Sequence, residues 1–102
     1  MIKMKRIDVL VFELSVIIQI CESEKEAIEN YQKKYKVCLE YQDSSGWCQS
    51  KDQDIYLWVT SEYWLLHEII HAAFSICENR HMKPDEEFIA YTAQYLYREF
   101  YK

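Results

Sequence analysis

Residues 54–79 read DIYLWVTSEYWLLHEIIHAAFSICEN and contain the clearest strand and helix patterns of the chain. Five of its first six residues are large and apolar, mostly β-branched or aromatic, which predicts a strand over Asp54–Val59. Thr60 or Ser61 can then cap a helix, and an acidic residue follows in the first turn, where the helix dipole favours it. We expect this helix to run from Ser61 to about Asn79.

Two histidines four positions apart lie in the middle of this predicted helix. Residues at that spacing share one helix face, so the imidazoles of His67 and His71 can converge on a single zinc ion. Glu68 is turned about 100° away, which is too far for a ligand but within reach of a metal-bound water. Zinc lowers the pKa of such a water towards 7, and a carboxylate can take its proton during attack on an amide carbonyl. The spacing predicts a catalytic zinc site.

The rest of the helix predicts its orientation. With His67 at 0°, the apolar side chains fall between about 140° and 240°, and two more lie beyond. The first group comprises Leu65, Ile69, Ala72, Ala73 and Ile76, and the second Leu66 and Ile70. A helix that is apolar around most of its circumference is expected inside the domain. Histidines there need polar partners, which a metal supplies.

A third metal ligand has to come from elsewhere in the chain. Along an unbroken helix Cys77 points well away from the histidine pair, and Glu78 faces their way but lies about 10 Å further along the axis. His81 falls in the connection after the helix and is one alternative. The final helix offers a better choice, Glu86 or Glu87.

The histidine motif and the start of the final helix together resemble a known family. The motif at 67–71 is followed sixteen residues later by Glu-Phe-Ile-Ala-Tyr at 87–91, an arrangement that resembles the gluzincin metallopeptidases. The thermolysin and aminopeptidase-N families place a Glu ligand on a second helix, with a small residue three positions on. Over residues 54–98 the chain is most similar to small single-domain zincin-like proteins of bacteriophages. The resemblance implies zinc at His67, His71 and Glu87, with Glu68 as general base.

The positions of the residues around the final helix leave Glu86 as an alternative third ligand. The clearest apolar stripe of the final helix is Ile89, Ala93, Leu96 and Phe100, and Glu86 lies nearer to it than Glu87 does. Glu87 is favoured because Ala90, three positions later, lets the two helices approach, whereas Ile89 would not. The six residues at 79–84 span about 20 Å when extended, which is enough for the connection.

The N-terminal half predicts a long strand and a helix. Residues 5–20 alternate apolar side chains on one face, which favours one strand, bent near Glu13, although some apolar positions also fit a helical spacing. Ser23 and Glu26 form a capping box that opens a helix to about Lys34.

Two short strands and a turn are expected between the predicted helices. Residues 37–41 are expected to form a short strand, followed by a turn at 43–46, with Gly46-Trp47 as a hairpin turn. Pro84 and Asp85 begin the final helix. The order β-α-β-β-α-α predicts an α+β fold, a minimal zincin-like domain over residues 1–102. In it, a small mixed sheet packs on the HExxH helix and a C-terminal Glu-bearing helix.

Composition limits the classes of partner. The chain has 102 residues, 50% of them hydrophobic, and a net charge of −5 with scattered basic residues, so no nucleic-acid partner is expected. The apolar run at 9–20 is too short and too polar to cross a membrane. We therefore expect a cytoplasmic protein, in the host cytoplasm if it is encoded by a phage. The four cysteines form no CxxC pair and are expected to be buried, reduced thiols.

Two functions follow from these features. The first is a zinc metallopeptidase acting on a protein or peptide, which would pair with an edge strand at 55–59, unless that strand is interior. Trp64 could line the mouth of the site or simply pack, and Tyr91, Tyr95 and Tyr97 could contact a ligand histidine or lie at the edge of the core. The alternative is a non-catalytic, phage-type interaction or inhibitor protein. It would keep a zincin-like fold, retain zinc as a staple and bind a host protein.

Overall fold

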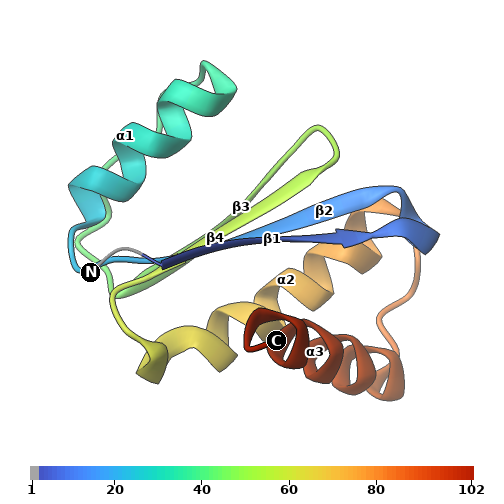
Figure 1. Cartoon of the computed structure of the whole chain (residues 1–102). Helices are drawn as coiled ribbons and strands as arrows, with labels where there is room; N and C mark the ends of the chain where they lie inside the picture. Colours follow the sequence, from blue (N-terminus) through green and yellow to red (C-terminus); the bar gives the residue numbers. More distant parts are fainter. Residues whose placement is uncertain (1–2) are drawn as a thin grey trace.

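A four-stranded sheet separates one helix from two others in the computed structural model, which describes residues 3–102 (Figure 1). The helix α1 lies on one side of the sheet, and α2 and α3 lie on the other. In chain order these described residues form β1 (Lys3–Val9), β2 (Leu14–Ile20), α1 (Glu24–Tyr35), β3 (Gly46–Lys51), β4 (Asp54–Val59), α2 (Leu65–Asn79) and α3 (Glu86–Phe100). The predicted α+β class with a small mixed sheet is confirmed, although the order of elements is β-β-α-β-β-α-α.

The strands lie in the order β1-β2-β4-β3. β1 and β2 are antiparallel, as are β3 and β4, whereas the central pair β2 and β4 is parallel. The parallel pair requires a connection that returns the chain to the starting end of the sheet. α1 and residues 36–45 lead back to the end where β2 stops, because Ile20 and Gly46 both lie beside Val59, and β3 then returns the chain to the start of β4. Because β4 lies between β2 and β3, residues 55–59 form an interior strand, the second of the two alternatives that the sequence left open. β3 forms the edge on that side.

Residues 5–20 form a hairpin and not one bent strand. A 3₁₀ turn over Leu10–Phe12 ends at Glu13, whose φ of 54° lies in the left-handed region, and the chain then reverses into β2. The change of direction was predicted at Glu13, but its size was not. Arg80, at the end of α2, donates hydrogen bonds to the carbonyl oxygens of Phe12 and Glu13 at 2.7 and 3.2 Å, which ties the hairpin turn to that helix.

The capping box before α1 is confirmed, because Ser23 Oγ accepts a hydrogen bond from the Glu26 amide at 3.2 Å.

The strand predicted at 37–41 is wrong, because residues 36–45 have no regular structure. In place of a neighbouring strand, the Glu24 side chain bonds to the backbone of this segment. Its buried carboxylate accepts hydrogen bonds from the amides of Gln42 and Ser44, at 2.7 and 3.0 Å, and so holds this segment against α1.

The hairpin turn predicted at Gly46-Trp47 is also misplaced. Gly46 begins β3, and the reversal into β4 occurs at Asp52 and Gln53. Trp47 is buried on the α1 side of the sheet, as expected for a packed aromatic residue.

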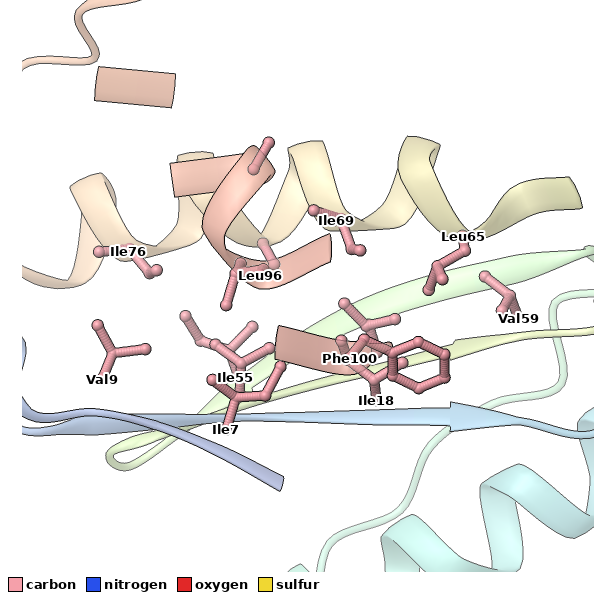
Figure 2. Close-up of a cluster of buried hydrophobic side chains, with 14 of the residues drawn as sticks. Ile7, Val9, Ile18, Ile55, Val59, Leu65, Ile69, Ile76, Leu96 and Phe100 are labelled. Atoms are coloured by element: carbon pink, nitrogen blue, oxygen red, sulfur yellow. The ribbon is translucent and has the colours of Figure 1, made fainter. Parts of the chain in front are cut away.

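Two apolar clusters fill the spaces between the sheet and its helices. Figure 2 shows the larger one, in which Ile18, Ile55 and Val59 of the sheet face side chains of α2 and α3. The smaller one lies under α1 and is rich in aromatic rings, several packed edge to face.

No helix within residues 3–102 is long and apolar enough to cross a membrane. The four cysteines are unpaired, and Cys38 is exposed, whereas buried thiols were expected.

Candidate metal centre

The sheet fixes the orientation of α2. The five residues predicted to form its buried stripe are each fully buried against the sheet. The opposite face therefore points away from the sheet, and it carries the two histidines. The expectation that the helix is enclosed on most sides is wrong, because Leu66, Ile70 and Phe74 are 51%, 39% and 47% exposed.

The histidine pair converges in space as the spacing predicted. The Nε2 atoms of His67 and His71 are 3.3 Å apart, and the ring planes meet at 69°. Two nitrogens bound to one tetrahedral zinc ion at about 2.0–2.1 Å are separated by about 3.3–3.4 Å. The pair has the spacing that two zinc ligands require. The side chain of His67 is 64% exposed, so a metal ion can reach it from solvent.

Glu68 lies beside this pair but in a different environment. Its Oε2 atom is 4.0 Å from His67 Nε2, and the residue is only 7% exposed. Burial raises the pKa of the Glu68 carboxyl, and the nearby His71 and His67 lower it in part. A raised pKa favours a carboxylate that accepts and returns a proton at neutral pH.

A polar cleft of about 370 Å³ lies between β3 and α2 and includes this carboxylate. The lining residues are Gln42, Gly46, Trp47, Cys48, Gln49, Glu68, His71, Phe74, Ser75 and Glu78. Sequence analysis did not assign the β3 residues to the site. The available signal was the single glycine, which is unusual inside a strand.

β3 also directs backbone groups that do not pair with β4 towards this cleft. The Thr60 amide donates to the Ser45 carbonyl at 2.9 Å, and Gly46 lies opposite Val59. Because bonded pairs alternate along an antiparallel ladder, the N–H and C=O groups of Gly46, Cys48 and Ser50 point to the open side of the sheet. Gly46 O accepts a hydrogen bond there from Ser44 Oγ at 3.1 Å. This open edge is where an extended peptide can pair.

The third ligand does not join the pair in this arrangement. Within residues 3–102, no three His, Cys, Asp or Glu side chains lie close enough together to hold a metal ion. Glu87 is exposed in the first turn of α3, where its amide donates to the Asp85 carboxylate at 3.3 Å. Glu86 lines an apolar groove with Ile70 and Phe74 of α2. The two histidines have the spacing of zinc ligands, but neither Glu86 nor Glu87 lies close enough to complete a metal site with them.

The other candidate ligands lie elsewhere. Cys77 is buried away from the histidines, and His81 is exposed in the connection with a left-handed φ of 54°. Glu78 lines the far end of the cleft.

The aromatic candidates do not line the cleft. Trp64 packs edge to face against Tyr63 and is absent from the lining of the cleft. Tyr91 and Tyr95 face the hairpin turn of β1 and β2, on the other side of α3 from its groove with α2, and Tyr97 is exposed.

Comparison of the chain with models of protein families, with curated proteins and with solved structures found no match. The chemistry of the site therefore has to be argued from its own residues. These are two convergent imidazoles open to solvent, a buried carboxylate beside them and a strand edge across the cleft.

Proposed function

We propose that this protein is a zinc-dependent peptidase, with His67 and His71 as metal ligands and Glu68 as general base. The observation that carries the proposal is the 3.3 Å separation of the two Nε2 atoms, which equals the distance between neighbouring ligands of tetrahedral zinc. A hydrogen bond between two imidazoles would be a weaker explanation, because 3.3 Å is long for an N–H···N contact. Zinc, when bound, lowers the pKa of a water ligand and polarises an amide carbonyl.

The chain's own groups would handle the proton and the substrate. Glu68 is turned from the ligand face towards the cleft, where its carboxylate can take a proton from the attacking water and return it to the leaving amine. A peptide in extended conformation can pair with the open edge of β3, which would lay its backbone across Glu68 and His71. In this proposal β3, and not residues 55–59, is the strand with which a substrate peptide pairs.

Glu87 remains the proposed third ligand, with Glu86 as the alternative. Both residues lie in the first turn of α3, and no other carboxylate of this helix is near its start. Zinc titration of the full-length Glu87→Gln and Glu86→Gln variants separates them. The true ligand should lose about 10–100-fold or more in zinc affinity, and the other variant should match the wild type. Equal affinities for both variants and the wild type would remove α3 from the site.

Metal analysis and a hydrolysis assay test the function itself. Wild-type protein should bind one zinc ion per chain, and His67→Ala or His71→Ala should abolish this binding. Glu68→Gln should keep the zinc and lose peptide hydrolysis, because it removes the base and leaves both histidines. Wild-type protein that binds no zinc, or hydrolysis that survives Glu68→Gln, would refute the proposal.

A second candidate function is a non-catalytic interaction protein, and an apolar groove favours it. The groove, about 450 Å³ between α2 and α3, adjoins the histidine face and is lined mainly by apolar side chains such as Ile70, Phe74 and Ile89. An exposed apolar groove on a small domain is typical of a surface that binds another protein. The number of protein ligands on the zinc ion distinguishes the two functions. A zinc site with a position open to water supports the peptidase, and four protein ligands or no zinc supports the interaction protein.

A further inference from the structure

The only glycine of the chain occupies an unfavourable place. Gly46 is the first residue of β3, and glycine weakens a strand because it has large conformational freedom when unfolded and no side chain to pack. Its usual advantage, a left-handed backbone, is not used here, because Gly46 does not have a positive φ. Five other residues adopt that conformation without glycine, namely Glu13, Lys36, Asp43, Asp52 and His81. Gly46 must serve another purpose.

The space around Gly46 identifies that purpose. A Cβ atom at this position would lie 2.9 Å from the backbone oxygen of Trp58, 3.0 Å from Val59 Cγ1 and 3.1 Å from Glu68 Cγ. The first two atoms belong to the neighbouring strand. The third belongs to the carboxylate side chain in the cleft. The backbone of β3 therefore lies directly against the side chain of Glu68.

This contact bears on where the carboxylate points. A glutamate side chain in a helix can take several rotamers. A Cβ at position 46 would lie only 3.1 Å from Glu68 Cγ, so glycine leaves room for the rotamer that Glu68 adopts. In this rotamer the carboxylate of Glu68 lies beside the histidines, with Oε2 4.0 Å from His67 Nε2. Catalytic groups lose rate when displaced by about 1 Å, so keeping this rotamer has a functional consequence.

We infer that Gly46 is a positioning residue, which acts by leaving room beside β3 for the Glu68 side chain, so that its carboxylate lies next to the histidine pair. The consequence for catalysis rests on the proposed function. The contact itself does not, and it can be measured without metal or substrate.

A double-mutant cycle on the metal-free, full-length protein measures the contact. Gly46→Ala should raise the equilibrium constant for unfolding in urea roughly tenfold more in the wild-type background than in the Glu68→Ala background, because only the former retains the clashing Cγ. Ser50→Ala is the matched control, since Ser50 lies on the same face of β3, and it should show no such coupling. Additive effects of Gly46→Ala and Glu68→Ala would overturn the inference.

A second measurement does not depend on the folding of the variant. The NMR spectrum of the wild-type protein should contain cross-peaks between the Hα protons of Gly46 and the Hγ protons of Glu68. Their absence would overturn the inference, whatever happens to Gly46→Ala.

Kinetics then test the positioning role. Gly46→Ala should lower kcat for peptide hydrolysis at least about tenfold and leave KM and zinc content unchanged. An unchanged kcat in a folded variant would overturn the role. A wild-type protein with coupling and cross-peaks but no hydrolysis would refute the proposed function and leave the contact standing.

Discussion

Replacement of the Glu68 carboxylate by a neutral amide should stabilise the metal-free protein. Glu68 is 7% exposed, and burial raises the pKa of its carboxyl, so folding works against the charged form. For Glu68→Gln at pH 7 we expect a gain on the order of 1 kcal/mol in the free energy of unfolding, the low end of the cost of burying a polar group without full hydrogen-bond compensation. In a chain of this size that corresponds to a melting temperature about 4–8 °C higher.

The gain should depend on pH in a defined direction. A carboxyl whose folded-state pKa is raised binds its proton more tightly in the native state than in the unfolded state, so the wild-type protein loses stability as pH rises from the unfolded pKa to the folded one. Below both pKa values the group is neutral in both states and the penalty is gone. The advantage of Glu68→Gln should therefore be largest at neutral pH and shrink as pH falls through the folded-state pKa.

Urea unfolding followed by circular dichroism, in the presence of a chelator, is the appropriate assay. Glu78→Gln is the control, because Glu78 is exposed on the same helix and its replacement should change stability by less than about 0.5 kcal/mol. If Glu68→Gln behaved like this control, or unfolded more easily than the wild type, the buried carboxylate would not carry the penalty we assign to it. Saturating zinc should reduce the gain, because the positive charge of the metal favours the carboxylate.

Four further outcomes are expected. Zinc at a hundred times its Kd should raise the free energy of unfolding by about 2.7 kcal/mol, and thermal melts of His71→Ala should show no such rise. Arg80→Ala should lower the free energy of unfolding in urea by about 1.5–3 kcal/mol, because its guanidinium donates to two carbonyls of the hairpin turn. Glu24→Gln should speed hydrogen exchange of the two amides it accepts from, before β3, by about tenfold or more. Tyr56→Phe should cost about 1–2 kcal/mol in urea, since it deprives the buried Gln19 carboxamide of a 2.6 Å hydrogen bond.

The segment from β4 to the end of α2 was predictable because its signals are local. The strand predicted over residues 54–59 coincides with β4, and the helix predicted to end near residue 79 ends there. The predicted start of this helix at Ser61 was less accurate, because residues 62–64 form a 3₁₀ turn and the Ser61 side chain makes no capping hydrogen bond. Period and motif spacing determine which face of a helix a residue occupies, and they placed the histidine pair correctly.

The hairpin at the N-terminus and the strand β3 were missed for physical reasons. Glu13 makes its sharp turn without glycine or proline, the residues that signal a reversal in a sequence. β3 has small side chains where its residues face α2, so it lacks the apolar alternation by which strands are recognised. That same feature leaves room for the cleft, so the strand hardest to predict is the one that shapes the site.

The third ligand could not be placed by local reasoning. Whether Glu86 or Glu87 meets the histidines depends on the rotation and distance of α3 relative to α2, and the sequence of α3 fixes neither. Ala93, Leu96 and Phe100 are buried against the core, so the apolar stripe of α3 was predicted correctly. The stripe orients α3 towards the sheet, whereas the first turn, which carries both glutamates, lies beyond that contact.

Several departures from ordinary folding preferences lie near the histidine pair. A carboxylate is buried, a strand begins with the only glycine, and apolar side chains such as Ile70 and Phe74 stay half exposed. Each of these costs stability, and all of them border the outward side of α2 or its contact with β3. Local conflicts of this kind are expected at functional sites, where selection for stability is overridden. Because the histidine pair lies beside them, these costs support the proposed site on this face of α2.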